Sequence, residues 1–267
     1  MSISFFTYQN LLGPKIRGEE IAAYLGAAYN SKRNGREVRA DVNIHVKPKS
    51  LDNVPDGDWV DITDGEWVPE LLASRPQVKA IAGSLYTYEK FSKMLPNEMV
   101  WISQQHLNWD RLKRDRKAVT TCGYIGGPSW QARDYYGALC GVIKEHGYEW
   151  TECFDFVTKQ DAIDFYKSID ILIVMHPGDD RLYKTPTKLI NAASFGIPAI
   201  AYPARGYKEW EGNYIKAKTL DEMLEGLAAL RDTYGQWPDK IMEASEYFHI
   251  SNVARRYEEL DDLHQGR

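Results

Sequence analysis

The sequence has few of the residues that build metal centres or disulfide frameworks. Its 267 residues include only three cysteines and six histidines. Cys122, Cys140 and Cys153 have no pairing motif and no metal-ligand spacing, which indicates reduced thiols in a cytoplasmic protein. The histidines form no H-E-x-x-H motif or related cluster, so the sequence predicts neither a structural nor a catalytic metal.

Long apolar runs are missing as well. No stretch reaches the roughly 18 apolar residues that cross a bilayer, so we expect no membrane insertion. Residues 1–8 form a short apolar run without a basic segment before it, which is typical of a first buried strand and not of a secretion signal. Hydrophobic residues make up 43% of the chain, enough for the cores of one or two domains.

A strong positive charge is also absent. The net charge of −5 argues against strong nonspecific binding to nucleic acid. The net charge is +2 over residues 1–117 and −7 over residues 118–267, which leaves a polyanionic partner of the first half open. The basic run 111–117 is typical of a solvated linker, and a nucleic-acid patch is the less favoured interpretation.

Short apolar runs alternate with helical periodicity through most of the chain. In the first half we expect strands near 2–7, 41–46, 58–62, 79–83 and 99–104, and helices near 18–30, 67–74 and 86–94. In the second half we expect strands near 118–124, 148–153, 170–175, 198–202 and 213–216, and helices near 130–146, 159–168, 185–195, 219–234 and 239–263. This alternation predicts an α/β protein with parallel sheets.

The two blocks predict two doubly wound domains that face each other across a cleft. We place the first domain at residues 1–110, a basic linker at 111–117 and the second domain at 118–240. Residues 241–267 complete a final helix that is long enough to cross back to the first domain. Ligands of such sheets bind beyond the carboxyl ends of the strands, where helix N-termini point.

The segment 184–202 is the most informative part of the chain. Thr185 or Thr187 can cap a helix there, the proline between them fits its first turn, and a glycine ends it before a buried strand. The start of this helix presents backbone N–H groups beside Lys184 and Lys188, a suitable place for a phosphate or diphosphate. A cation in the first turn is unfavourable unless an anion is bound, or a nearby carboxylate or water relieves it, so Lys188 also points to a bound anion.

Residues 188–200, Lys-Leu-Ile-Asn-Ala-Ala-Ser-Phe-Gly-Ile-Pro-Ala-Ile, resemble the donor-site helix of GT-B glycosyltransferases. The resemblance is to the retaining group 1 enzymes, whose pattern is K-L-x-E-A-x-x-x-G-x-P-V-I. Asn191 stands where many of these enzymes have a glutamate that holds the nucleotide ribose, and an amide can still bond a hydroxyl. The acidic residue expected eight positions earlier is replaced by Tyr183.

The resemblance implies a compact GT-B fold of two Rossmann-like domains. It implies a nucleoside-diphosphate sugar as donor, expected to be a UDP-sugar, with no cofactor and no bound metal. It also implies retention of the anomeric configuration. Basic residues and helix N-termini would then stabilise the leaving diphosphate.

Two glycine-containing loops lie at the expected carboxyl ends of strands. The loop after the first strand contains Gly13, Lys15 and Arg17, and it resembles the glycine-rich loop of GT-B enzymes that faces the donor phosphates and the acceptor. Gly126 and Gly127 occupy the equivalent place in the second half. For the first loop the alternative is an ordinary β–α loop with solvated bases, and we favour a functional role because the loop lies at the carboxyl end of the first strand.

Further candidates come from the helix and loops around the donor segment. In the resembling family the helix after the second glycine loop often carries a basic residue near the diphosphate, for which Arg133 is the candidate, with an exposed helix arginine as an equal alternative. His176, Asp179 and Asp180 precede Lys184 in a loop expected over the sugar, where the aspartates would bond its hydroxyls or form a plain surface turn. We expect Lys184 to neutralise the leaving diphosphate.

One more candidate comes from the first half. His106 follows the last strand there and would reach the donor sugar or the acceptor, with a strand-capping role as the more common alternative.

These observations predict a glycosyltransferase that moves a sugar from a nucleoside diphosphate to an acceptor hydroxyl. The expected acceptor is a glycan or another small hydroxyl compound, and a hydroxymethylated DNA base is an alternative. Two other classes stay open. A sugar-nucleotide 2-epimerase would alter the donor without an acceptor, and a non-catalytic sugar-nucleotide-binding protein would bind without turnover.

Overall fold

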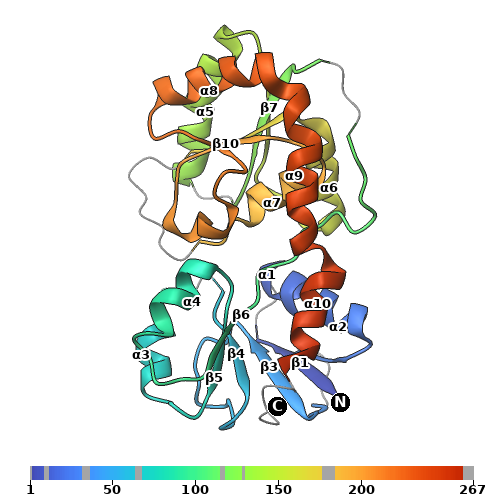
Figure 1. The fold of residues 1–267 in the computed structure, drawn as a ribbon, viewed down its shortest axis with the longest axis vertical. Helices are drawn as coiled ribbons and strands as arrows, with labels where there is room; N and C mark the ends of the chain where they lie inside the picture. The colour runs from blue at the N-terminus through green and yellow to red at the C-terminus, as the bar shows by residue number, and fades with distance from the viewer. Residues whose placement is uncertain are drawn as a thin grey trace.

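The computed structural model describes residues 2–8, 12–31, 37–63, 68–114, 118–127, 130–175 and 184–260. Their strands form two separate sheets, one above the other along the long axis of the molecule (Figure 1). The first sheet has strand order β2-β1-β3-β4-β5-β6 and the second β11-β10-β9-β7-β8. All neighbouring strands in both sheets run parallel, which confirms the predicted α/β fold of two doubly wound halves.

The first sheet contains all five strands predicted for the first half, which are β1 (Ile3–Thr7), β3 (Val42–Val46), β4 (Trp59–Asp61), β5 (Lys79–Ala82) and β6 (Met99–Trp101). It also contains β2 (Ala28–Ser31), which the sequence did not predict. Its helical segments are α1 (Leu12–Pro14), the π-helical turn η1 (Lys15–Glu20), α2 (Ile21–Leu25), α3 (Val68–Ala73) and α4 (Leu85–Phe91). Helices α2 and α10 (Ile250–Glu258) pack on one face of this sheet, and α3 and α4 on the other.

The helix predicted over 18–30 is wrong at its end. It stops at Gly26, whose φ of 64° is left-handed, and the chain then forms β2 along the edge of the sheet. The side chain of Asn30 bonds the hydroxyl of Ser4 at 2.6 Å and the carbonyl of Val38 at 3.0 Å. Pairing with β1 and these bonds outweigh the local helical tendency of the alanine-rich stretch.

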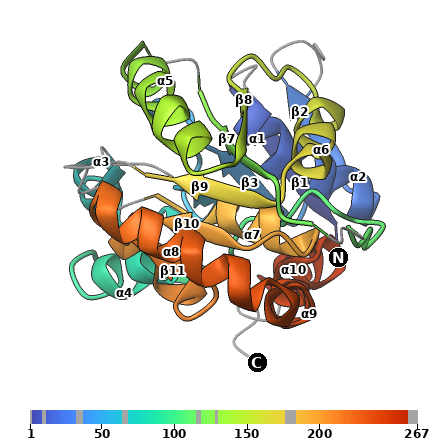
Figure 2. The ribbon, with the colours of Figure 1, turned by 90° about the horizontal axis from the view of Figure 1, so that it is seen from above.

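The second sheet is built from β7 (Thr121–Ile125), β8 (Glu149–Cys153), β9 (Ile171–Val174), β10 (Ala199–Ala201) and β11 (Ile215–Lys216). Its helices are α5 (Trp130–Glu145), α6 (Lys159–Ser168), α7 (Thr187–Ser194), the 3-10 turn η2 (Arg205–Trp210), α8 (Leu220–Thr233), the 3-10 turn η3 (Tyr234–Gln236) and α9 (Trp237–Ser245). Helices α5 and α8 cover one face, and α6, α7 and α9 the other (Figure 2).

The single final helix predicted near 239–263 is two helices. Helix α9 passes into the 3-10 turn η4 (Glu246–Phe248), and the backbone is extended at His249 before α10 begins. The imidazole Nδ1 of His249 accepts a hydrogen bond from the backbone N–H of Ser251, so this side chain caps α10. Helix α9 packs against α7 of the second sheet, and α10 packs against α2 of the first.

The described part of the basic run is paired with acidic side chains. Arg111 forms a bidentate ion pair with Glu246 of η4, at 2.9 and 3.0 Å, and Lys113 pairs with Asp239. Arg114 Nη1 lies 3.0 Å from Asp170, whose side chain is fully buried. These ion pairs fasten the linker to the chain that follows it, and Arg111 and Lys113 stay exposed, as expected for a solvated linker. In the part of the chain described here, no helix has both the length and the apolar character to cross a bilayer.

Candidate functional site

The carboxyl-terminal ends of the two sheets face each other. Residues that follow β5 and β6 contact residues that follow β10 or begin α7. The 3-10 turn η2 packs on α4, and the hydroxyl of Thr187 lies 3.4 Å from Oε1 of Gln104. This is the face where doubly wound sheets bind ligands.

The start of α7 differs from the prediction in how it is capped. Neither Thr185 nor Thr187 caps the helix; Pro186 occupies the N-cap position, with φ −75° and ψ 23°. The two threonine hydroxyls instead bond each other at 2.7 Å, and Thr187 donates onward to Gln104. Among the described residues, no side chain therefore caps the first N–H groups of α7, and the hydroxyls tie this helix end to the segment after β6.

Lys188 meets the end of β7, as expected for a site shared by two loops. Its Nζ donates to the phenol oxygen of Tyr124 at 3.0 Å and lies 4.4 Å from the centre of that ring. A β-carbon on Gly126 would lie 2.2 Å from the same phenol oxygen, so only glycine fits there. Gly127 is exposed and has open space around it. The structure thus brings Lys188, Gly126 and Gly127 together, and adds Tyr124, which the sequence did not single out.

The backbone of Lys184 packs directly against the turn η2. A β-carbon on Gly206 of η2 would lie 1.9 Å from the carbonyl oxygen of Lys184, so the two backbones are in direct contact. The Lys184 side chain is half-buried. The turn after β10 therefore fixes the position of the residue that precedes α7.

The turn η2 also forms the contact between the two halves on the side away from the linker. Lys208 forms an ion pair with Glu89 of α4, and the carboxylate of Glu209 accepts from the backbone N–H of Leu85 at 3.3 Å. Burial raises the pKa of Glu209 to about 7. Sequence reasoning missed Glu209, because nothing in its neighbourhood indicates that α4 would cover it.

Asn191 does not have the role that the resemblance implied. Its side chain is 6% exposed, and its amide oxygen accepts a hydrogen bond from the backbone N–H of Leu107 at 3.0 Å. The oxygen expected to meet a ribose hydroxyl is thus buried and already accepts a hydrogen bond within the protein. Asn191 fastens α7 to the linker between the halves.

Arg17 lies inside the first half. Its side chain has no exposed surface and pairs with the buried carboxylate of Asp61, while Nη2 donates to the carbonyl of Ile102. Its guanidinium lies 6.0 Å from the ring centre of Tyr257 in α10. Because the cation is enclosed by its own domain, we assign Arg17 to the fold and not to phosphate binding.

A lysine from the loop after β3, Lys47, lies against the first loop, where the sequence predicted a role for Arg17. A β-carbon on Gly13 would lie 3.5 Å from Nζ of Lys47, the residue that follows β3. Lys47 has a φ of 47°, an uncommon conformation for a residue with a side chain. Such strained positions cluster at functional sites. Lys15 is half-buried on the same loop as Gly13.

His106 packs where the segment after β6 meets η4 and His249, and it does not reach the facing ends of the sheets. Its side chain is 2% exposed, and its ring meets the edge of His249 with centroids 5.4 Å apart. Burial, with smaller effects from His249, Arg111 and Lys159, lowers the pKa of His106 to about 3. The expected contact of His106 with sugar or acceptor is therefore wrong.

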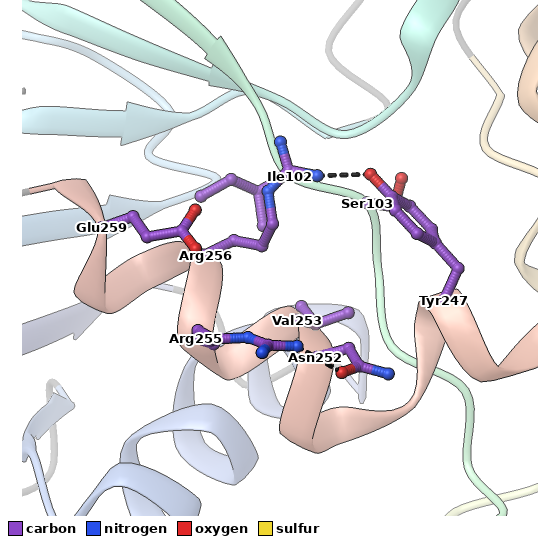
Figure 3. Close-up of a pocket in the computed structure, with 8 residues that line it drawn as sticks. All are labelled: Ile102, Ser103, Tyr247, Asn252, Val253, Arg255, Arg256 and Glu259. Carbon is purple, nitrogen blue, oxygen red and sulfur yellow. Dashed lines mark hydrogen bonds between the residues drawn. The ribbon is translucent and has the colours of Figure 1, made fainter.

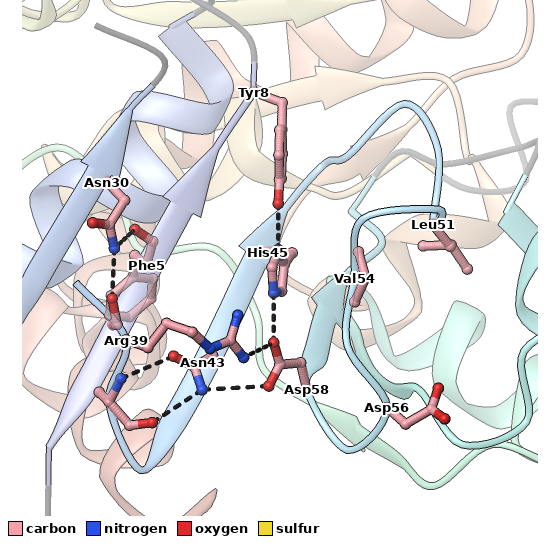
Figure 4. Close-up of polar contacts among 12 residues, drawn as sticks. Phe5, Tyr8, Asn30, Arg39, Asn43, His45, Leu51, Val54, Asp56 and Asp58 are labelled. Carbon is pink, nitrogen blue, oxygen red and sulfur yellow. Dashed lines mark hydrogen bonds and ion pairs between the residues drawn. The ribbon is translucent and has the colours of Figure 1, made fainter. Parts of the chain in front are cut away.

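A buried hydrogen-bonded chain lies below the end of β1 (Figure 4). The hydroxyl of Tyr8 lies 2.5 Å from Nδ1 of His45, and Nε2 of His45 lies 2.8 Å from Asp58, which also bonds Arg39 and Asn43. Burial opposes ionisation of Asp58, but hydrogen bonds from His45 and Arg39 outweigh it and hold its pKa below the usual value. Burial raises the pKa of Tyr8 to about 12, so this phenol stays protonated. The chain fixes Tyr8 at the end of the first strand.

Several predicted residues lie outside this description. His176, Asp179 and Asp180 fall outside the described residues, as does the side chain of Arg133. Among the described residues, no group of three or more His, Cys, Asp or Glu side chains is placed to hold a metal ion.

Comparison with known proteins identifies the fold. No protein-family model matches the chain, and no curated protein matches it. Among solved structures, HepE from Anabaena, in complex with UDP and glucose, has a TM-score of 0.59 at 11% identity, and the match covers 98% of this chain and 99% of that one. The lipopolysaccharide outer core galactosyltransferase WaaB has a TM-score of 0.57 at 11% identity, with 97% and 98% covered.

Larger proteins share the same architecture. A TarM variant from S. aureus, in complex with fondaparinux, α-GlcNAc-glycerol and UDP, has a TM-score of 0.59 at 12% identity, with 82% of this chain covered. The chain spans only 55% of that TarM. Together these likenesses show the GT-B glycosyltransferase fold, with two Rossmann-like domains.

Proposed function

We propose that this protein is a glycosyltransferase that takes a sugar from a nucleoside-diphosphate sugar. One observation carries the proposal. On a GT-B fold, the start of α7, which no described side chain caps, and the end of β7 meet at Lys188, which lies on Tyr124 beside Gly126. Uncapped N–H groups at a helix start, together with a lysine, favour a phosphate or diphosphate.

The donor diphosphate is proposed to lie against the first turn of α7. Lys184 and Lys188 would offset its charge, and Thr185, Thr187 and the backbone near Gly127 would supply hydrogen bonds. Basic side chains and a helix N-terminus can stabilise a leaving diphosphate in this way without a metal. The expected donor is a UDP-sugar, which the UDP-bound structures of HepE and TarM support by analogy.

The remaining predicted residues keep proposed roles around this position. Asp179, Asp180 and His176 would contact the sugar, and Arg133 the diphosphate. Gly13 and Lys15, now with Lys47, would face the donor phosphates and the acceptor. Retention of configuration is proposed from the resemblance of the α7 segment alone.

The acceptor is proposed to be a glycan or another small hydroxyl compound. WaaB and TarM support this choice by analogy, since WaaB is a lipopolysaccharide outer core galactosyltransferase and the TarM variant is in complex with fondaparinux and α-GlcNAc-glycerol. A modified DNA base is the weaker proposal. The basic side chains that suggested it, Arg111, Lys113 and Arg114, are paired with carboxylates.

A thermal-shift screen against UDP, GDP, ADP and CMP and their sugar conjugates tests the donor site. A ligand that binds only the folded state adds about 2.7 kcal/mol at 100 times its dissociation constant. We expect one nucleotide, UDP, to raise the melting temperature clearly. No shift with any of them would refute the proposed function.

Substitution then locates the site. Lys184→Ala should raise the dissociation constant of UDP about tenfold or more, because it removes a charge-assisted contact. Asp52→Ala, an exposed change in a distant loop, is the control and should leave it unchanged. Equal effects of the two variants would rule out α7 as the donor site.

One observation favours a second candidate, a binding protein without turnover. Asn191 stands at the position of the ribose-binding glutamate, and its amide oxygen already accepts a hydrogen bond from the backbone N–H of Leu107. Hydrolysis of a UDP-sugar by the purified protein would exclude this candidate, whereas tight donor binding with neither hydrolysis nor transfer would support it.

A further inference from the structure

A cavity of about 310 Å³ lies where the linker after β6 passes the final helix (Figure 3). Its polar lining comes from the linker, from η4 and from α10, namely Ser103, Tyr247, Asn252, Arg255, Arg256 and Glu259. None of these residues belongs to the candidate donor site. The cavity is therefore a separate feature, placed at the segments that join the two domains.

Arg256 is held rigidly at this cavity. Its Nη2 donates to the carbonyl of Trp101 at 2.9 Å, and Nη1 bonds the hydroxyl of Tyr247. The guanidinium also lies 5.7 Å from the ring centre of Trp101 and 5.9 Å from that of Tyr247. A guanidinium has five N–H donors, so these two bonds fix its plane and leave donors for a ligand.

Arg255 adds a second guanidinium from the neighbouring position of α10. Its side chain is exposed, and its Nη2 donates to the amide oxygen of Asn252 at 2.6 Å. Glu259 is the one acidic residue of the lining, and it forms no ion pair with either arginine among the described residues. The lining therefore carries an excess of positive charge.

Ser103 supplies an unsatisfied polar group on the opposite wall. Its side chain is 5% exposed, and its hydroxyl has no hydrogen-bond partner among the described residues. A buried hydroxyl without a partner is unfavourable, so its retention beside a cavity points to a ligand.

We propose that this cavity binds a small phosphate monoester. Two guanidiniums and a hydroxyl match the several oxygens of a phosphate better than the two oxygens of a carboxylate. The volume is near the lower end of the range for ligand pockets, about 300 Å³, which suits a phosphorylated sugar or polyol and not a nucleotide sugar. The ester could be soluble or the headgroup of a lipid.

The cavity lies at the two segments that join the domains, so a ligand bound there would affect how the domains move relative to each other. Ser103 belongs to one segment that joins the domains, and Arg255 and Arg256 follow the other. A phosphate between them would link these segments and restrict movement of one domain relative to the other. Binding at this cavity would then regulate the protein from outside the donor site.

Isothermal titration of the full-length protein with glycerol 3-phosphate tests the proposal, with and without UDP. We expect binding in both conditions, because the cavity is separate from the site proposed for UDP. Arg255→Ala should raise the dissociation constant about tenfold or more, and Ser103→Ala should raise it as well. Arg231→Ala, an exposed arginine of α8, is the matched control and should change nothing.

Co-sedimentation with vesicles containing phosphatidic acid distinguishes the source of the phosphate. Vesicle binding that Arg255→Ala removes, without binding of glycerol 3-phosphate, supports the site with a lipid headgroup as ligand. Absence of binding to both probes overturns the proposal. So do equal affinities of the parent protein and Arg255→Ala, or full displacement of glycerol 3-phosphate by UDP, which would place the phosphate in the donor site.

Discussion

Replacing Glu209 with glutamine should stabilise the protein at alkaline pH. The Glu209 carboxylate accepts from the backbone N–H of Leu85, and its other oxygen is buried with no hydrogen-bond partner among the described residues. Burial raises its pKa from 4.5 to about 7. Ionisation of Glu209 is therefore less favourable in the folded protein than in the unfolded chain, and it lowers the free energy of unfolding.

The magnitude follows from this difference in pKa. At about 1.4 kcal/mol for each pH unit, the shift of the Glu209 pKa from 4.5 to about 7 corresponds to at most about 3.5 kcal/mol. The stabilisation from the neutral carboxyl is complete below the unfolded pKa of 4.5 and is lost as the pH rises through about 7. Glutamine keeps an oxygen acceptor for Leu85 and has no charge to bury.

The assay is chemical denaturation of the parent protein and of Glu209→Gln at several pH values. The variant should exceed the parent in unfolding free energy by up to about 3 kcal/mol near pH 8, and by much less near pH 5. Glu89→Gln is the control in the same interface, because its ion pair with Lys208 is largely exposed and should contribute less than about 1 kcal/mol. A difference between parent and Glu209→Gln that does not change with pH would refute the reasoning.

Other substitutions test the donor-side contacts. Gly126→Ala should displace the Tyr124 phenol and weaken UDP binding measured by titration, whereas Gly127→Ala, with open space around it, should not. Asn191→Ala should lower the unfolding free energy by about 1–3 kcal/mol in urea titrations, because the N–H of Leu107 loses its acceptor. If Asn191→Ala leaves the affinity for UDP unchanged, Asn191 only holds α7 to the segment after β6. A large loss of UDP affinity would instead show that Asn191 contacts the ribose.

The sequence predicted best those elements whose ends are encoded locally. Helix α6 matches its predicted range, because Thr158 and Asp161 form a capping box at its start. The strands of both sheets were predicted from short apolar runs, which stay apolar because parallel strands are buried on both faces. These signals are present in a few neighbouring residues and need no knowledge of distant contacts.

Most of the misses depend on residues far apart in the chain. The helix over 18–30 ends early because β2 pairs with β1. The break in the final helix is the exception, because His249 caps α10 through its near neighbour Ser251. Asn191 and Arg17 had suitable chemistry for a ligand, yet each meets a partner 84 or 44 residues away within the protein. Spacing along the chain does not reveal such partners.

The break at His249 has a mechanical consequence. The chain passes between the domains twice, through the linker and through η4, and the two passages are bonded together. His106 N–H donates to Phe248 at 2.9 Å, and His249 Nε2 lies 3.0 Å from the carbonyl of Trp109. Two passages bonded together resist twisting as one cannot, so an opening of the two halves about these passages would have to separate the contact between α4 and η2.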